Sequence, residues 1–165
     1  MIDLERKHLA LLREVDRRGL AGAADIRLCF QVLSLASSID RDCAALLAPH
    51  GLSEGRFVLL FLLDAAPDGL APHALAREAG VSRATITGLL DGLERAGLVV
   101  RQAAADDRRA LTVRLTRQGR ALAGQLFETH AQWVAGLFGG LSAAERATLA
   151  ALLDKVGGAL ADVAA

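Results

Sequence analysis

The sequence predicts a mostly α-helical fold that carries one small β-hairpin. Apolar residues recur at spacings of three and four along several segments, as on the buried stripe of an amphipathic helix. Two short strand-like runs, Val99–Arg101 and Leu111–Leu115, break this pattern and flank the charged loop Asp106-Asp107-Arg108-Arg109. The chain has 165 residues, which suits one domain with extensions and is enough for a real core.

Helices are expected at both ends of the chain. The first two cover residues 1–18 and the stretch from Asp25 to about Ala48, where Pro49-His50-Gly51 ends the second. Thr116 caps a helix that reaches about Phe138, and the capping box Ser142–Glu145 opens the last helix. The last helix has a single apolar face, made of Leu149, Leu152, Leu153, Val156 and Leu160.

Three shorter helices are expected before the hairpin. Ser53 caps a helix from Glu54 to about Ala65, Pro72 opens a second that ends near Gly80, and Ser82 caps a third. The last two have the helix-turn-helix pattern, in which a tight turn joins two crossed helices locked by apolar residues. Followed by a basic hairpin, they have the layout of a winged helix, and the sequence therefore predicts a winged helix-turn-helix with additional terminal helices.

The helix over residues 82–96 has two different faces. Ile86, Leu89, Leu90 and Leu93 share the side that is expected to pack inward. Small, hydroxyl and arginine side chains lie elsewhere on the helix and allow close approach to bases and phosphates. Asp91 would repel phosphates, so we expect it to accept a hydrogen bond or to pair with an arginine. The candidate DNA contacts of this helix are Ser82, Arg83, Ala84, Thr85, Thr87, Gly88 and Arg95.

Charge is distributed unevenly along the chain. The formal net charge is zero, which counts mildly against nucleic-acid binding. From Ala71 to Arg120, however, nine arginines face five acids, giving a local charge of +4. Arginine can bind phosphates and guanine edges and can enter a narrow minor groove.

The run Val81–Val99 and the following hairpin resemble the multiple-antibiotic-resistance regulator (MarR) family. The family's wing signature D-x-R-x-x-x-V-x-L-T matches at Asp107, Arg109, Val113, Leu115 and Thr116. The resemblance implies a homodimeric repressor of palindromic double-stranded DNA, with residues 1–52 and 117–165 forming the dimer and 53–116 the DNA-binding lobe. It also implies that Arg109 enters the minor groove while Asp107 braces it, with Arg108 beside them.

The same resemblance implies a small, often aromatic and anionic effector that releases DNA. Its pocket would draw on Cys29, Leu33, Ser37, Arg56, Phe57 and Phe61, with Arg56 able to hold a carboxylate. An alternative is peroxide sensing through Cys29, because Arg27–Leu33 is similar to the first-helix motif of the organic-peroxide-sensing branch. That branch holds its cysteine with tyrosines, and this chain has none.

Other classes find less support. The sequence has no nucleophile, histidine and acid grouping and no phosphate-binding glycine loop, so no enzyme and no cofactor are predicted. His8, His50, His73 and His130 lack zinc-site spacing, and no metal is expected. Without a long apolar run or a signal segment, we expect a cytoplasmic protein with no membrane contact. A winged helix used only for protein contact remains an alternative to DNA binding.

Overall fold

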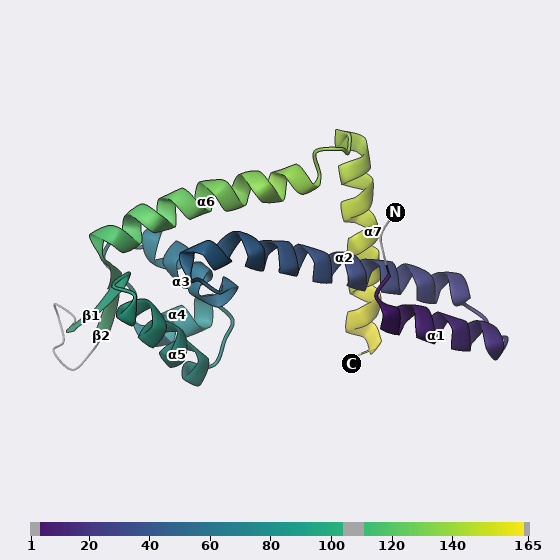
Figure 1. The fold of residues 1–165 in the computed structure, drawn as a ribbon, viewed down its shortest axis with the longest axis horizontal. Coiled ribbons are helices and arrows are strands. Elements are labelled where there is room, and N and C mark those ends of the chain that lie inside the picture. Colours follow the sequence, from purple (N-terminus) through teal and green to yellow (C-terminus); the bar gives the residue numbers. More distant parts are fainter. Residues whose placement is uncertain (1–3, 104–110, 164–165) are drawn as a thin grey trace.

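The computed structural model describes residues 4–103 and 111–163 of the chain, and Figure 1 shows their arrangement. A lobe of short elements lies at one end, and long helices extend from it to the other end. The elements in chain order are α1 (Arg6–Arg17), α2 (Ala23–Leu47), the 3-10 turn η1 (Ala48–His50), α3 (Glu54–Asp64), α4 (Pro72–Glu78), α5 (Arg83–Arg95), β1 (Val99–Ala103), β2 (Leu111–Leu115), α6 (Arg117–Leu137) and α7 (Ala143–Val163).

The expected fold class is confirmed, and most helix ends follow from local chemistry. The Thr116 hydroxyl accepts a hydrogen bond from the Gly119 amide at 3.0 Å and so caps α6. In the capping box before α7, the Ser142 amide donates to Glu145 at 2.8 Å and the Glu145 amide donates back to Ser142 at 3.3 Å. Ser53 occupies the expected cap position of α3, but its side chain makes no capping hydrogen bond. Strand β1 runs to Ala103, beyond the expected end at Arg101.

Helix α3 lies at the centre of the lobe core. Leu59 and Leu60 are fully buried and Leu63 is 1% exposed, so three of its eleven residues are inaccessible to water. The helix contacts α2, α4, α5, α6 and β2. Burying a leucine side chain stabilises a fold by about 1.5–3 kcal/mol, so this helix holds the surrounding elements together.

The hairpin is anchored to the lobe at its base. β1 and β2 are antiparallel, with Val99 opposite Leu115 and Arg101 opposite Val113. Leu70 forms an isolated antiparallel β-bridge with β2. Its amide donates to the Val113 carbonyl at 3.0 Å, and its carbonyl accepts from the Val113 amide at 2.9 Å. Gly69 makes this approach possible: its φ is +82°, and a Cβ there would lie 2.5 Å from the Val113 carbonyl oxygen.

Helix α1 packs against α2 through a buried histidine that periodicity did not single out. His8 is 5% exposed and Ser34 is 2% exposed. The His8 Nδ1 lies 3.1 Å from the Ser34 hydroxyl, and its ring stacks on Phe30 with centroids 4.6 Å apart. The buried side of α2 therefore includes a polar residue, Ser34.

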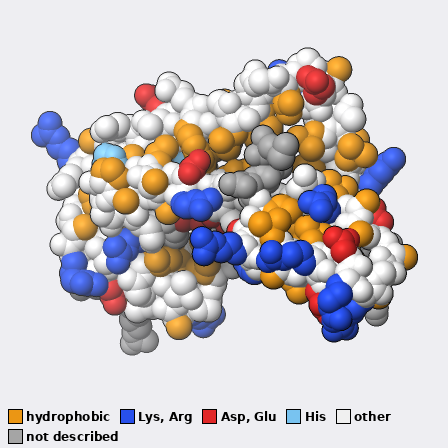
Figure 2. Space-filling view, turned by 45° about the vertical axis from the view of Figure 1, so that its right-hand side comes forward, with side chains coloured by type: hydrophobic (Ala, Val, Ile, Leu, Met, Phe, Trp, Pro, Cys, Tyr) orange, Lys and Arg blue, Asp and Glu red, His pale blue; other side chains and the backbone are white. Residues whose placement is uncertain are grey.

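The long helices leave much apolar surface uncovered within one chain. On α2, Leu28 and Leu33 are 58% and 48% exposed, and on α7 Leu152 and Val156 are 53% and 60% exposed. Figure 2, which brings the end with α1, α7 and the first half of α2 forward, shows apolar side chains open to solvent there. Large exposed apolar patches on a folded protein mark interaction surfaces.

No single helix of the described residues is long and apolar enough to cross a membrane. The bent pair of Ala23–His50 and Glu54–Asp64 passes on length and composition alone.

The junction between the hairpin and α6 gives a test of the fold. A Cβ at Gly119 would collide with the backbone carbonyl of Leu98, so Gly119→Ala should destabilise the protein by about 1–3 kcal/mol. Gly124 lies in the same helix with open space around it, and Gly124→Ala should stabilise by about 0.5–1 kcal/mol. Urea unfolding followed by circular dichroism measures both. Equal midpoints for the two variants would contradict the close approach.

Candidate nucleic-acid interface

Helix α5 is held in the lobe by its cap and by its buried face. The Ser82 hydroxyl accepts a hydrogen bond from the Thr85 amide at 3.1 Å, as the sequence predicted. Ile86, Leu90 and Leu93 are at most 1% exposed, and Leu89 is half-buried against Gly55 of α3. The predicted inward face is therefore confirmed, and it fixes which side of α5 faces outward.

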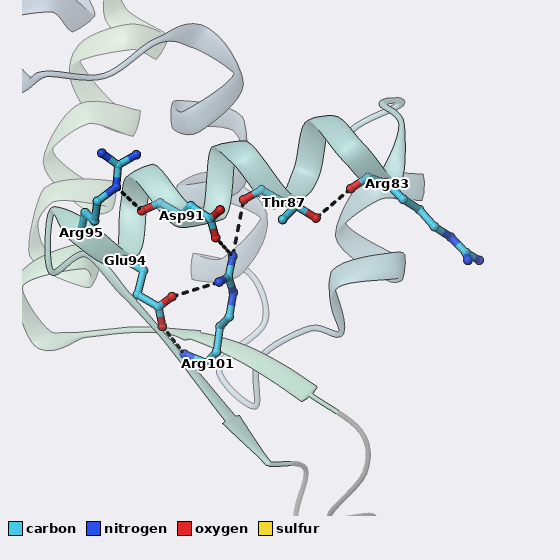
Figure 3. A network of polar contacts seen from close by, with 6 residues as sticks. All are labelled: Arg83, Thr87, Asp91, Glu94, Arg95 and Arg101. Atoms are coloured by element: carbon cyan, nitrogen blue, oxygen red, sulfur yellow. Dashed lines mark hydrogen bonds and ion pairs between the residues drawn. The ribbon is translucent and has the colours of Figure 1, made fainter.

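The outward side of α5 carries the predicted small and hydroxyl residues. The residues at these positions are all exposed: Ser82, Arg83, Ala84, Thr85, Thr87 and Gly88. Figure 3 shows Arg83 extending away from the helix into solvent. The Thr87 hydroxyl donates to the Arg83 carbonyl at 3.0 Å, and a Cβ at Gly88 would meet nothing within 4 Å. A helix N-terminus with small side chains and one long cationic side chain can enter a major groove.

Further along α5, two acids are joined to an arginine from the hairpin. Arg101 of β1 donates to the Asp91 carboxylate at 2.6 Å and to the Glu94 carboxylate at 3.1 Å. The Arg101 backbone amide also donates to Glu94 at 3.3 Å, and its guanidinium reaches the Thr87 carbonyl at 3.5 Å (Figure 3). The expectation that Asp91 pairs with an arginine is confirmed, and the partner is one that the sequence did not identify.

Arg95 stands at the last turn of α5. Its Nε donates to the Asp91 carbonyl at 3.2 Å, while the side chain as a whole stays exposed (Figure 3). It therefore remains available on the same side of the helix as Asp91. The other predicted contacts, Asp107, Arg108 and Arg109, lie outside the described residues.

The six residues predicted to line an effector pocket differ in their burial. Phe57 is buried and Phe61 is 40% exposed, and their rings lie against His130 and Phe127 of α6 respectively. Cys29, Leu33 and Ser37 are exposed along α2 in the single chain. Periodicity marks a face as apolar but does not say whether the same chain covers it. Cavities of about 430 and 520 Å³ are lined by other residues.

Arg56 occupies an unusual position between α3 and α5. Its guanidinium packs so closely on Gly92 that a Cβ there would overlap it. One Nη donates to the Gly51 carbonyl at a long 3.4 Å. Its Nε is buried and, within residues 4–103 and 111–163, has no hydrogen-bond partner. A buried donor without an acceptor is costly, so this group would gain from an anion or water at its side.

One side-chain pair was missed because it joins residues far apart in the sequence. The Cys43 Sγ of α2 lies 3.7 Å from the His130 Nε2 of α6, and His130 also packs near Trp133. Burial raises the pKa of the Cys43 thiol, and the nearby carboxylates of Glu54 and Asp40 raise it further. Among the described residues, no group of three or more His, Cys, Asp or Glu side chains could hold a metal.

A capped helix with an exposed polar face, preceded by a crossed helix and followed by a two-stranded hairpin, defines a winged helix-turn-helix DNA-binding protein. A model of the MarR family matches residues 50–110. The transcriptional repressor YetL of Bacillus subtilis is 33% identical over 132 residues, covering 77% of this chain and 79% of YetL. The chain belongs to the MarR family, and it is a DNA-binding transcriptional regulator rather than an enzyme.

Solved structures of relatives have the same fold. The repressor CouR, bound to a 23-mer DNA duplex, matches with a TM-score of 0.68 and 28% identity, covering 82% of this chain and 96% of CouR. The apo form of MarR from Escherichia coli matches with a TM-score of 0.62 and 29% identity, covering 76% of this chain and 93% of MarR. The winged-helix fold expected from the sequence is confirmed by these matches.

Proposed function

We propose that the protein is a homodimeric repressor that binds a palindromic double-stranded operator in the cytoplasm and is released by a small aromatic or anionic effector. The exposed polar face of α5 carries this proposal, because it combines an accessible arginine with small side chains at a helix N-terminus. YetL is a repressor, and CouR is a repressor bound to DNA.

The contacts with DNA would divide by chemistry. Arg83 would reach a phosphate or a guanine edge, and the hydroxyls of Ser82 and Thr85 would lie at the backbone. The hairpin tip with Asp107, Arg108 and Arg109 would extend to the neighbouring minor groove. Arg95, exposed at the other end of α5, would add a phosphate contact.

A dimer would cover the apolar faces that one chain leaves open. Leu28 of α2 and Leu152, Leu153 and Val156 of α7 are each at least half exposed. Such faces on the terminal helices are expected to pair with the same helices of a second copy. The two-fold symmetry of that pair would match the symmetry of a palindromic duplex.

The DNA contacts predict a specific effect of Arg83. The wild-type chain should select an inverted repeat from a random pool of double-stranded DNA, and Arg83→Gln should bind the selected duplex more weakly. If Arg83 contacts a phosphate, the log–log dependence of the binding constant on salt should flatten by about 0.9. Fluorescence anisotropy between low and high salt measures both quantities.

The matched control for this experiment is Arg13→Gln, which removes an exposed arginine from α1, outside the lobe. It should leave affinity and salt slope unchanged. A wild-type affinity that is independent of salt, or selection of no duplex at all, would favour the protein-contact alternative.

The dimer predicts an effect of charge on α7. Val156 is 60% exposed in one chain and lies on the apolar face of α7, so Val156→Glu places a carboxylate on that face. The dimer dissociation constant should rise at least tenfold, which corresponds to about 1.4 kcal/mol. Ala151→Glu adds the same charge on the opposite side of α7 and should not raise it. Sedimentation equilibrium gives the mass of each variant. A wild-type chain that sediments as a monomer would contradict the dimer.

The effector would bind near the boundary between the lobe and the long helices. Arg56 supports an anionic group there, because its buried Nε has no acceptor within the described part of the chain. The rings of Phe57 and Phe61 would supply the aromatic surroundings, and Cys29, Leu33 and Ser37 of α2 would complete the site from the other side.

A peroxide-responsive repressor is the second candidate, and the exposure of Cys29 favours it. Under this alternative, an organic hydroperoxide should release the duplex from the wild type but not from Cys29→Ser. Cys43→Ser is the matched control and should respond like the wild type, because Cys43 is buried and its pKa is raised. Anisotropy with the selected duplex follows release. A Cys29→Ser variant that still releases DNA under peroxide would eliminate the redox mechanism.

A further inference from the structure

We propose that Arg101 is a positioning residue that fixes the angle of the hairpin wing relative to the recognition helix α5, and that Asp91 and Glu94 serve DNA binding by holding it. The inference deepens the proposed function, on which its DNA-binding part rests. It assigns a role in recognition to two acids on the DNA-binding helix and to an arginine that would not itself touch DNA.

The geometry ties one strand residue to three successive positions along α5. Asp91 lies about one helical turn after Thr87, and Glu94 lies about one turn after Asp91, so the three residues line a single stripe of the helix. The Arg101 guanidinium lies along this stripe and binds all three, at 3.5, 2.6 and 3.1 Å (Figure 3). Because a planar guanidinium bonded at several points has a fixed orientation, the contact sets both distance and angle.

Among the residues that the structure describes, those of the wing beyond Arg101 are largely exposed. Gln102 and Ala103 are exposed, and Leu111, opposite Ala103, is 51% exposed. An isolated two-stranded hairpin is only marginally stable in water, so its direction depends on contacts at its base. Arg101 lies where the buried base of the hairpin ends, so its contacts set the direction of the strand residues that follow it.

The bonding of Arg101 distinguishes it from an arginine that binds phosphate. Its side chain is 24% exposed, and both Nη atoms donate to carboxylates of α5. Arg83, by contrast, is exposed and points away from the helix (Figure 3). If Arg101 left its ion pairs to bind DNA, the carboxylates of Asp91 and Glu94 would lie unpaired beside the phosphates. Repulsion between these negative charges would weaken binding.

This arrangement predicts that neutralising Asp91 lowers the affinity for DNA, whereas charge repulsion alone predicts the opposite. Removing an acid from a DNA-binding face normally strengthens binding by reducing repulsion of the phosphates. If Asp91 holds Arg101, however, Asp91→Asn should weaken binding, as should Arg101→Gln, by about tenfold each. The double variant should be no weaker than either single one, because both changes break the same contact.

The first arm of the test measures binding of the duplex selected by the wild type, over a range of salt. We expect Arg101→Gln to lose affinity with its log–log salt slope unchanged, since no phosphate contact is lost. Arg114→Gln is the matched control: Arg114 lies on β2 opposite Val100, is exposed, and within the described residues forms no ion pair. A slope reduced by about 0.9 in Arg101→Gln, together with tighter binding by Asp91→Asn, would overturn the proposal.

The second arm needs no DNA. The backbone amide at position 101 donates to Glu94, so its hydrogen exchange reports whether β1 is held on α5. Exchange measured by NMR should accelerate about tenfold in Asp91→Asn and Arg101→Gln but not in Arg114→Gln. Unchanged exchange in the first two variants would show that the wing is fixed by other contacts and would overturn the proposal.

The two arms separate this inference from the proposed function. If the wild type selects no duplex, the repressor proposal fails, while the exchange measurement still decides whether Arg101 fixes the wing. If the wild type binds DNA but neither variant changes affinity or exchange, the repressor proposal stands and the role of Arg101 is rejected.

Discussion

The burial of the apolar face of α5 against α3 is the constraint on which the rest of the structure depends. Ile86, Leu90 and Leu93 leave no freedom to rotate the helix about its axis, because any rotation would expose them. The orientation of the outward side chains follows from this packing. Two glycines allow the close approach: a Cβ at Gly55 would lie 3.2 Å from Leu89, and one at Gly92 would overlap Arg56. The recognition surface is therefore specified from the core outward.

The terminal helices obey a different constraint. Their lengths exceed what the lobe can cover, and their apolar faces remain open in one chain. A long amphipathic helix gains most of its stability from tertiary packing, so α7 in particular needs a surface that the described residues do not provide. A second copy would supply that surface and at the same time fix the separation of two recognition helices. The same dimer contact would then both stabilise the terminal helices and place the two recognition helices for a symmetric duplex.

Local chemistry made much of the fold predictable from the sequence. Cap residues, glycines after helices and the change from helical to strand periodicity marked nearly every element, and Ser82 and Thr116 cap as expected. The side chains that needed tertiary placement were not predictable in the same way. Asp91 was expected to pair with an arginine, yet the sequence contains several nearby and could not single out Arg101. Two acids three residues apart on a helix, followed by an arginine in the next strand, would have been the available signal.

The same limit explains Cys29 and Cys43. Both lie on the apolar stripe of one helix, and a stripe does not reveal which part of it the chain buries by itself. The half near the lobe is covered by α3 and α6, where Cys43 meets His130. The other half extends beyond the lobe, and Cys29 is exposed there. Burial along α2 thus depends on where the neighbouring helices end, and the hydrophobic periodicity of α2 itself cannot predict this.

The neutral overall charge is compatible with DNA binding once the acids of α5 are paired. Asp91 and Glu94 would oppose a polyanion if they stood alone, but Arg101 neutralises one charge between them, and Arg95 adds another positive charge one turn away from Asp91. The C-terminal half of the helix is then close to neutral, while the N-terminal half has Arg83 and the positive end of the helix dipole. Attraction for phosphates is concentrated at the start of α5, and this gradient along the helix would orient it end-on to the groove.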